Sequence, residues 1–471
     1  MGEYLDKGLH EECGVFGVYR QSDAAHLTYF GLHALQHRGQ EGAGIAVADG
    51  KTVRCRKGKG LLGDVFGRND LDGMTGKNAI GHVRYGTAGG GEVENVQPIV
   101  SRLANGGALA VAHNGQIANA AELRKELEDK GSIFWGSSDS EIILHLLQGT
   151  KGPLIEKIKQ ACNRLDGAFA FLILTEKNLY AVRDKNGLRP LSLAKQGDGW
   201  CVSSESCAFD IVGAHLVRDV RPGEIVKISA AGLESCFYTE ETSCNLCAME
   251  YIYFSRPDSV LEGQNVHGVR RECGRLLAQE DLDSFFKADI VVGVPDSSLS
   301  AAAGYSEAIG LPNEMGLIKN RYVGRTFIQP TQAQRDLGVR LKLSANVPVV
   351  RGKRVVLVDD SIVRGTTSKR IVALLRQAGA TEVHLRIAAP AIKYPCFYGV
   401  DMSTRAELAS ASLEPDVLAK VLGADSLRFL SVDDLKQTCG CQGLCTACFD
   451  GSYVTPLYSN KVCEKYHRRK A

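Results

Sequence analysis

Short hydrophobic runs bounded by glycine, aspartate and asparagine dominate the first half of the chain. Runs of this kind are typical of β-strands. They lie at Val15–Tyr19, Gly44–Ala48, Leu109–Ala112, Ala168–Leu174, Leu179–Val182 and Ile225–Ile228. Helices are predicted to begin after Asn119 and Ser138, because both residue types cap helix N-termini and each is followed three residues later by a glutamate. Blocks of strands with interspersed helices predict a layered α/β sandwich.

The second half has a different pattern. Ile290–Val294 and Val355–Val358 are continuous hydrophobic runs, as expected for parallel strands covered on both faces. After the second run, hydrophobic residues recur at helical spacing until Gly379. Alternating strands and helices of this kind predict a doubly wound parallel sheet. The predicted units are a first domain over 13–240, a second over 248–437 and a cysteine-rich segment over 438–471.

Composition and charge exclude several classes of protein. Of the 471 residues, 44% are hydrophobic and 23% are charged, and the net charge is +2, so a globular chain without a general affinity for nucleic acid is expected. No hydrophobic run approaches the ~18 residues of a membrane span, and the first residues lack the features of a signal peptide. A cytoplasmic protein is therefore predicted. The chain has 15 cysteines, and in a reducing compartment so many indicate metal, cluster or catalytic use.

Polar residues directly after Val355–Val358 form the strongest motif of the second half. Asp359 and Asp360 place two carboxylates at the carboxyl end of a buried strand, where ligands bind in open α/β sheets. The loop that follows opens a helix, and its N–H groups and hydroxyls suit a phosphate. The loop residues with these donors are Ser361, Arg364, Gly365, Thr366 and Thr367. Paired carboxylates beside a phosphate loop suit ribose hydroxyls or Mg²⁺.

This segment resembles the phosphoribosyl-pyrophosphate (PRPP) loop of type I phosphoribosyltransferases. Val294–Ser297 is similar to their pyrophosphate loop. The intervening stretch, 319–342, carries six cations against the single anion Asp336, as expected for a flap over a polyanion. The six cations are Lys319, Arg321, Arg325, Arg335, Arg340 and Lys342. The resemblance implies that Lys319 and Arg321 contact PRPP and that Ser297, Asp359 and Asp360 lie near Mg²⁺.

A second set of motifs lies in the first half. Its members are Cys13–Gly17, Gln36–Glu41, His82–Thr87, His113–Gly115 and Ser137–Ser140. Together they resemble the glutamine amidotransferases with an N-terminal nucleophile. The resemblance implies that Cys13 is the nucleophile and that Arg38, Arg84 and Asp139 bind glutamine. Arg84 suits the α-carboxylate and Asp139 suits the α-ammonium. The Asn114 amide and the Gly115 N–H suit an oxyanion hole.

Cys13 poses a chemical difficulty because it is not the first residue. A terminal cysteine carries an α-amine with a pKa of ~7.7–8.0, which can serve as the base, whereas an internal one has only an amide nitrogen. We therefore predict that Met1–Glu12 is a propeptide, removed by cleavage of the Glu12–Cys13 bond.

The remaining cysteines include two C-x-x-C pairs, Cys244–Cys247 and Cys445–Cys448. Four thiolates bind either zinc or a [4Fe–4S] cluster, and spacing alone does not separate the two groups. The chain is similar to the members of the amidotransferase family that carry a propeptide. This similarity implies a [4Fe–4S] cluster on Cys247, Cys396, Cys445 and Cys448. Cys244, Cys439 and Cys441 are surplus, so the choice between Cys244 and Cys247 stays open at this point.

Both motif sets in one chain resemble the glutamine phosphoribosylpyrophosphate amidotransferases. The resemblance implies an N-terminal αββα sandwich joined to a type I phosphoribosyltransferase domain, with glutamine and PRPP as substrates. It also implies passage of ammonia between two sites in the first committed step of purine synthesis, feedback inhibition by purine nucleotides, and a homotetramer. The alternatives are another glutamine amidotransferase, such as a sugar-phosphate isomerising enzyme, and a PRPP-sensing regulator without activity.

Overall fold

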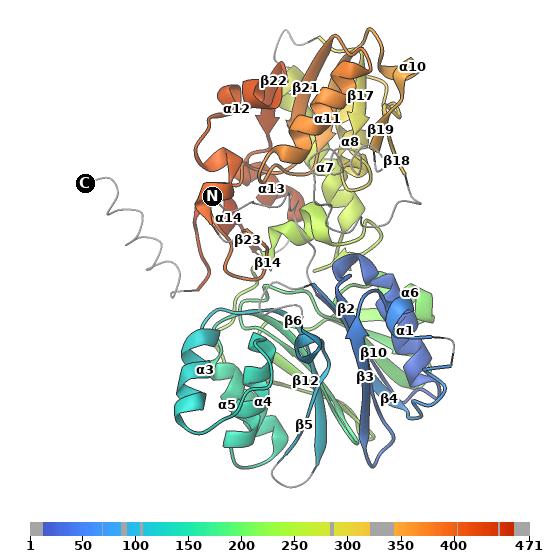
Figure 1. The fold of residues 1–471 in the computed structure, drawn as a ribbon, viewed down its shortest axis with the longest axis vertical. Coiled ribbons are helices and arrows are strands. Elements are labelled where there is room, and N and C mark those ends of the chain that lie inside the picture. The colour runs from blue at the N-terminus through green and yellow to red at the C-terminus, as the bar shows by residue number, and fades with distance from the viewer. Residues whose placement is uncertain are drawn as a thin grey trace, which may run out of the picture.

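The computed structural model describes residues 13–67, 69–85, 92–103, 107–282, 287–320, 343–402, 404–440 and 443–455. The chain forms two halves that meet along a junction crossed by β14 (Leu246–Cys247) and β23 (Leu444–Cys445) (Figure 1). None of the described helices is long and apolar enough to cross a lipid bilayer.

Two stacked antiparallel sheets form the first half. The seven-stranded sheet has, in spatial order, β11 (His215–Asp219), β9 (Ser192–Gln196), β10 (Gly199–Ser203), β1 (Gly14–Tyr19), β4 (Asn78–Arg84), β2 (Gly42–Ala48) and β3 (Val53–Lys59). The six-stranded sheet has β13 (Gly232–Phe237), β12 (Glu224–Ser229), β8 (Leu179–Arg183), β7 (Gly167–Thr175), β6 (Ala108–Ile117) and β5 (Ile99–Arg102).

Helices cover the outer faces of both sheets. One buried cluster packs β1, β2 and β4 against α1 (Ala24–Ala34), α2 (Leu62–Val65) and α6 (Cys207–Val212). Another packs β6 and β7 against α3 (Ala120–Asp129), α4 (Ile142–Gly149) and α5 (Leu154–Arg164). A third, which includes Val15, Ile80 and Leu172, lies between the sheets. These three cores confirm the αββα sandwich.

The second half is built on a four-stranded parallel sheet. Its order is β17 (Ile290–Gly293), β20 (Arg354–Asp359), β21 (Glu382–Ile387) and β22 (Ser426–Phe429), and all three strand pairs are parallel. One core joins it to the long helices α7 (Val266–Leu282), α8 (Leu299–Ile309), α11 (Thr366–Gln377), α12 (Pro415–Leu422) and α13 (Val432–Cys439). The predicted parallel sheet of hydrophobic strands is thus confirmed.

Smaller elements complete the second half. The pairs β15 (Val260–Leu261) with β16 (Gln264–Asn265) and β18 (Leu317–Lys319) with β19 (Leu343–Ala345) are antiparallel. The short helices are α10 (Val347–Val350) and α14 (Ala447–Asp450), and a π-helix, η4, spans Glu250–Phe254. Among the described residues, the 3₁₀ turns are η1 (Gln36–Arg38), η2 (Val93–Asn95), η3 (Asp139–Glu141), η5 (Arg405–Glu407) and η6 (Ala409–Ala411).

Candidate active sites

The predicted nucleophile stands at the start of β1. Cys13 is half-buried, and its Sγ lies 3.4 Å from the Tyr85 carbonyl oxygen and 3.5 Å from the Tyr85 nitrogen. Tyr85 follows the last residue of β4, which pairs with β1, so the sheet register sets this contact. Arg84, the last residue of β4, is 5% exposed. The sheet therefore places Cys13 near Arg84, the residue predicted to bind the α-carboxylate of glutamine.

The pKa of the Cys13 thiol shows why this nucleophile needs a base. Burial raises it to about 11, and the positive charges of Arg84 and Arg38 offset this only in part. The negative charge of Asp139 raises it further, which also shows that Asp139 lies near the thiol. At neutral pH the thiol is protonated, and attack on an amide carbon requires that its proton be removed.

Asn114 and Gly115, the predicted oxyanion donors, lie on β6 of the second sheet. Asn114 is fully buried on β6, and its Nδ2 donates to Ser204 Oγ at 3.3 Å, while the Val15 N–H donates to the same oxygen at 3.0 Å. Ser204 thus joins the nucleophile's strand to Asn114. Among the described residues, Asn114 Oδ1 has no hydrogen-bond partner, so this buried amide keeps an unused acceptor, whereas an oxyanion would take the Nδ2 donor that now bonds to Ser204.

Gly115, next to Asn114, occupies a position that only glycine fits. Its φ is +139°, and a Cβ there would lie 2.1 Å from the Ala168 carbonyl oxygen on the neighbouring strand. Because β6 and β7 pair closely across this position, the Gly115 backbone is fixed in orientation.

Asp139 begins the short helix η3 and is held by its neighbours. Its Oδ2 accepts from the Ile117 N–H at 2.8 Å and its Oδ1 from the Ser140 hydroxyl at 3.3 Å. Ser138 caps η3 by accepting from the Ser140 N–H at 3.3 Å. The glutamate three residues after Ser138 does not complete the cap as the sequence suggested: the Glu141 carboxylate accepts from the N–H groups of residues 135 and 136, and the Ser138 N–H donates to Asn95 Oδ1.

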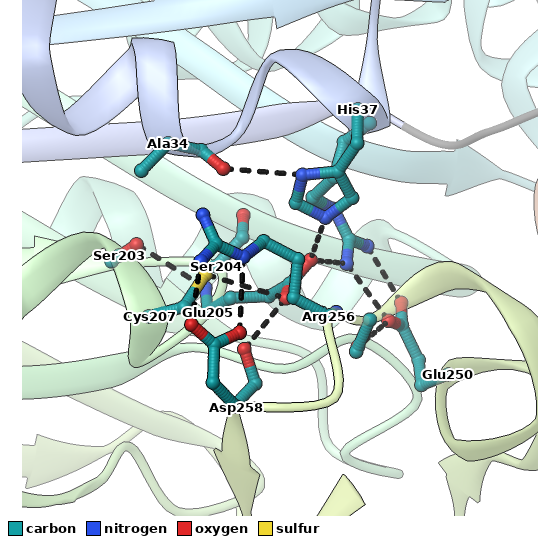
Figure 2. Close-up of polar contacts among 12 residues, drawn as sticks. Ala34, His37, Ser203, Ser204, Glu205, Cys207, Glu250, Arg256 and Asp258 are labelled. Carbon is teal, nitrogen blue, oxygen red and sulfur yellow. Dashed lines mark hydrogen bonds and ion pairs between the residues drawn. The ribbon is translucent and has the colours of Figure 1, made fainter. Parts of the chain in front are cut away.

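The contacts of Arg38 do not support its predicted role in binding glutamine. Its side chain is 1% exposed, and its guanidinium donates to Glu205 Oε1 at 2.7 Å and to both oxygens of Glu250 at 2.7 and 2.9 Å (Figure 2). Its Nε donates to the Cys13 carbonyl oxygen at 3.1 Å. The side chain thus binds the protein itself at the domain junction. Sequence reasoning assigned no role to Glu205 or Glu250, although Glu250 lies in a segment, 249–253, that resembles the family.

The second site lies where β20 ends. Asp359, Asp360, Ser361, Arg364, Gly365, Thr366 and Thr367 all line one cavity of about 200 Å³. Val294 and Ser297 of the expected pyrophosphate loop line it too, as does Tyr253. Gly365, with φ +77°, turns the chain so that α11 begins at Thr366. The cavity therefore meets the N-terminus of a 12-residue helix, where N–H groups favour a phosphate.

The two carboxylates of this site are buried and adjacent. Ser298 Oγ donates to Asp359 Oδ1 at 3.0 Å, Ser361 Oγ donates to Asp360 Oδ1 at 2.6 Å, and Ser297 Oγ donates to Asp360 Oδ2. Burial and the neighbouring negative charge of Asp360 raise the pKa of Asp359. A cation placed here would relieve the repulsion, and the donor set of carboxylates and hydroxyls fits Mg²⁺.

Two of the positively charged residues predicted to bind PRPP, Lys319 and Arg364, lie in the part of the chain that the structure describes. Lys319 Nζ donates to Asp296 Oδ2 at 2.7 Å, which places it beside the expected pyrophosphate loop. Arg364 is held by Glu407. Arg321 and the other predicted flap cations, 325, 335, 340 and 342, lie outside the described residues.

The four cysteines of the predicted cluster set line another cavity. Cys247, Cys396, Cys445 and Cys448 all border it, together with Arg189. The parallel pairing of β14 with β23 sets Cys247 directly opposite Cys445. Cys244 and Cys439 do not border this cavity, which favours Cys247 over Cys244.

Four thiolates at this cavity would suit either zinc or an iron–sulfur cluster. Among the described residues, no group of three or more His, Cys, Asp or Glu side chains is arranged to hold a metal ion. Burial raises the pKa of Cys247 and of Cys445 to about 12. The Arg189 charge opposes both shifts and suits a group that brings net negative charge with its thiolates.

Comparisons with known proteins match both halves of the chain. The family model of the glutamine amidotransferase domain matches residues 89–210, and that of the phosphoribosyl transferase domain matches residues 262–392. The amidophosphoribosyltransferase of Bacillus subtilis (strain 168) is 54% identical over 463 residues, 97% of either chain. That of Staphylococcus aureus (strain MRSA252) is 50% identical over 469 residues, 98% of this chain and 94% of the relative.

Solved structures give the same result. The glutamine PRPP amidotransferase from B. subtilis, complexed with ADP and GMP, superposes with a TM-score of 0.90 at 52% identity and covers 95% of this chain and 98% of its own. A structure described as the allosteric regulatory enzyme of purine biosynthesis has a TM-score of 0.90 at 54% identity, with 95% and 97% coverage. The chain therefore belongs to the amidophosphoribosyltransferase family.

Proposed function

We propose that the chain makes 5-phosphoribosylamine from glutamine, water and PRPP, with glutamate and pyrophosphate as the other products. One observation carries this proposal: a single chain contains both a cysteine site with an amide and glycine beside it and a separate phosphate-loop cavity with an acid pair. The first site suits acyl transfer and the second suits a sugar diphosphate.

In the first site, the Cys13 sulfur attacks the amide carbon of glutamine. Ammonia leaves, a thioester forms, and water then releases glutamate. The Asn114 side chain and the Gly115 N–H stabilise the oxyanion, and a donor of this type is worth ~3–4 kcal/mol in the transition state. Arg84 and Asp139 hold the carboxylate and ammonium of the substrate. The α-amine that serves as base requires that residues 1–12 be removed.

In the second site, the loop 361–367 holds the 5-phosphate and the two aspartates hold the ribose hydroxyls. Mg²⁺ bound by Asp359, Asp360 and Ser297 would neutralise charge on the leaving pyrophosphate. Departure of pyrophosphate makes C1 electron-poor, and neutral ammonia adds there. Because ammonium predominates in water at pH 7, ammonia passes between the sites within the protein.

Further features of the family are proposed in the same way. Cys247, Cys396, Cys445 and Cys448 would hold a [4Fe–4S] cluster, whose position at the domain junction indicates a structural role. The B. subtilis relative was solved with ADP and GMP, which supports purine nucleotides as regulators of this chain. Assembly into a homotetramer is also expected.

Two variants test the two-site assignment. Cys13→Ala should abolish glutamine-dependent synthesis and leave ammonia-dependent synthesis intact. Asp360→Asn should do the reverse, sparing glutamate release while pyrophosphate release is lost from either nitrogen source. Anaerobically purified protein is required for both, with N-terminal sequencing to identify the first residue. If Cys13→Ala also lost ammonia-dependent synthesis, or kept glutamine-dependent synthesis, the assignment would be wrong.

A further inference from the structure

A buried set of polar side chains lies beside Asp139, the residue predicted to bind the α-ammonium of glutamine. Its centre is Ser140 Oγ, which lies 3.0 Å from Gln97 Nε2, 2.9 Å from His113 Nδ1 and 3.3 Å from Asp139 Oδ1. Gln97, His113 and Ser140 are at most 4% exposed. They come from three separate stretches of the chain, so the fold brings them together.

Gln97 lies just before β5, the edge strand of the six-stranded sheet. β5 pairs with β6 as far as Ile99, which lies opposite Val111, and continuing this register would place residue 97 opposite His113. At that point the Gln97 side chain takes over the pairing, because its Oε1 accepts from the His113 N–H at 2.7 Å. Its Nε2 donates to Ser140 Oγ. One side-chain amide therefore connects β6, which carries the predicted oxyanion donors, to the first turn of η3.

The hydrogen-bonding capacity of the Ser140 hydroxyl matches its three neighbours. A hydroxyl donates one proton and accepts two. Burial lowers the pKa of His113, so its ring is neutral at pH 7 and carries a single proton. When that proton is on Nδ1, the ring and the Gln97 amide both donate to Ser140 Oγ. The hydroxyl proton is then donated to the Asp139 carboxylate, and all three contacts are hydrogen bonds.

The network ends on a carboxylate that is only partly buried. Each oxygen of Asp139 has one donor within the protein: the Ile117 N–H at 2.8 Å for Oδ2 and the Ser140 hydroxyl for Oδ1. Two donors on different oxygens fix the plane of the carboxylate, and its other lone pairs stay available for a substrate ammonium. Without the hydroxyl, only one oxygen is held, and the carboxylate is free to rotate about its Cβ–Cγ bond.

A purely stabilising role would not require polar side chains at these positions. Replacing both partners of a buried hydrogen bond by apolar groups of the same shape costs little stability, whereas a polar network is costly unless every member is satisfied. Apolar side chains could fill the space between β6 and η3, but they could not orient a carboxylate. Orientation of Asp139 is therefore the effect that distinguishes this network from ordinary core packing.

We propose that Gln97 and Ser140 are positioning residues that orient the Asp139 carboxylate and thereby make the cysteine site selective for amides that carry an α-ammonium group. This inference rests on the proposed function. The compound 4-carbamoylbutanoate has the amide and carboxylate of glutamine but no amine, so it would lack the interaction. Because the α-ammonium lies apart from the reacting amide, its binding is the same in ground state and transition state, and its loss raises KM more than it lowers kcat.

The test compares L-glutamine with 4-carbamoylbutanoate as substrates of the processed chain, with PRPP and Mg²⁺ present, by quantifying glutamate and glutarate. The variants are Ser140→Ala, which removes the donor to Asp139, and Gln97→Met, which keeps the length of the side chain but removes both hydrogen bonds. Ser192→Ala is the matched control: this serine is also fully buried and donates to Asp219 Oδ1 at 2.5 Å, but it lies on β9, which β10 separates from β1. The melting temperature and ammonia-dependent synthesis show whether each chain is folded.

We expect the wild type to prefer L-glutamine by about tenfold or more in kcat/KM, the factor that a hydrogen bond to a charged group supplies. In Ser140→Ala and Gln97→Met, the KM for glutamine should rise by about tenfold with a smaller change in kcat, whereas the kinetics with 4-carbamoylbutanoate should stay the same. Ser192→Ala should keep the full preference.

The inference is overturned if the wild type does not prefer glutamine, if both variants keep the preference, if kcat/KM falls equally for the two amides, or if Ser192→Ala loses the preference as well. If one variant does not fold, the other variant and the wild-type comparison decide. A wild type that deamidates neither compound would instead reject the proposed function.

Discussion

Replacing Gly115 by alanine tests the oxyanion site most directly. The new Cβ would lie 2.1 Å from the Ala168 carbonyl oxygen and 2.8 Å from its carbon, so either β6 or β7 must move. A φ of +139° is also unfavourable for alanine, and backbone strain of this kind costs about 1–3 kcal/mol. The movement displaces the N–H that faces the developing oxyanion.

The expected effect on catalysis follows from the loss of one donor. Removal of an oxyanion donor lowers kcat by about 10²–10³, equivalent to ~2.7–4 kcal/mol. Glutamate release by Gly115→Ala should fall by this factor, whereas pyrophosphate release with ammonium chloride as nitrogen source should stay near the wild-type rate. The free energy of unfolding should fall by about 1–3 kcal/mol in urea titrations.

Gly149→Ala provides the matched control. Gly149 is the last residue of α4, and a Cβ there would meet nothing within 4 Å. Alanine is the better helix former by up to about 1 kcal/mol, so this variant should keep both activities and lose no stability. The reasoning would be refuted if Gly115→Ala released glutamate at the wild-type rate, or if both activities fell together.

Three further predictions concern the other groups. Because folding raises the pKa of Asp359, the free energy of unfolding should fall as the pH rises above ~3.9, the pKa of an aspartate in the unfolded chain. Asp359→Asn should therefore raise the melting temperature of the Mg²⁺-free chain, as measured by calorimetry. Mg²⁺ with PRPP should raise the melting temperature of the wild type only. Cys247→Ser should lose iron and sulfide in anaerobic analysis while Cys244→Ser keeps both, and equal loss would contradict the choice of ligands. The rate at which iodoacetamide alkylates Cys13 of the uncleaved chain should rise with pH up to a pH of about 11. In the chain that begins at Cys13, a plot of this rate against pH should show a second transition at ~8, from the α-amine. Identical plots for the two chains would contradict the predicted propeptide.

The hydrophobic pattern predicted six strands of the first half and two of the second, and it missed or shortened strands that carry candidate site residues. The run Leu109–Ala112 predicted only part of β6, which continues through Asn114 and Gly115 to Ile117. Asn114 and Gly115 interrupt the hydrophobic run, so the pattern ends before the strand does. Sequence reasoning predicted none of β3, β4, β5, β9, β10, β11 and β13 in the first half, and neither β21 nor β22 in the second.

Among the candidate site residues, those in local motifs were predicted better than those that distant parts of the chain bring together. Motifs of neighbouring residues, such as the loop 361–367, placed their members correctly in one cavity. Arg38 was misplaced because its partners, Glu205 and Glu250, lie 167 and 212 residues further along the chain. Only the fold brings these carboxylates together, and no local pattern signals such pairings. The Cys247–Cys445 alignment likewise depends on two strands from distant parts of the sequence.

The packing of the C-terminal segment around Cys445 against the first half has a consequence for synthesis of the chain on the ribosome. Cys445, Ala447 and Tyr453 pack against Ala168 and Leu188 of the first half, and Ala168 is the residue whose carbonyl abuts Gly115. At a translation rate of about 5–20 residues per second, the first half emerges many seconds before this segment exists. The apolar patch around Ala168 and Leu188 thus stays uncovered until translation is nearly finished, and a truncated product would leave it exposed to quality-control proteases.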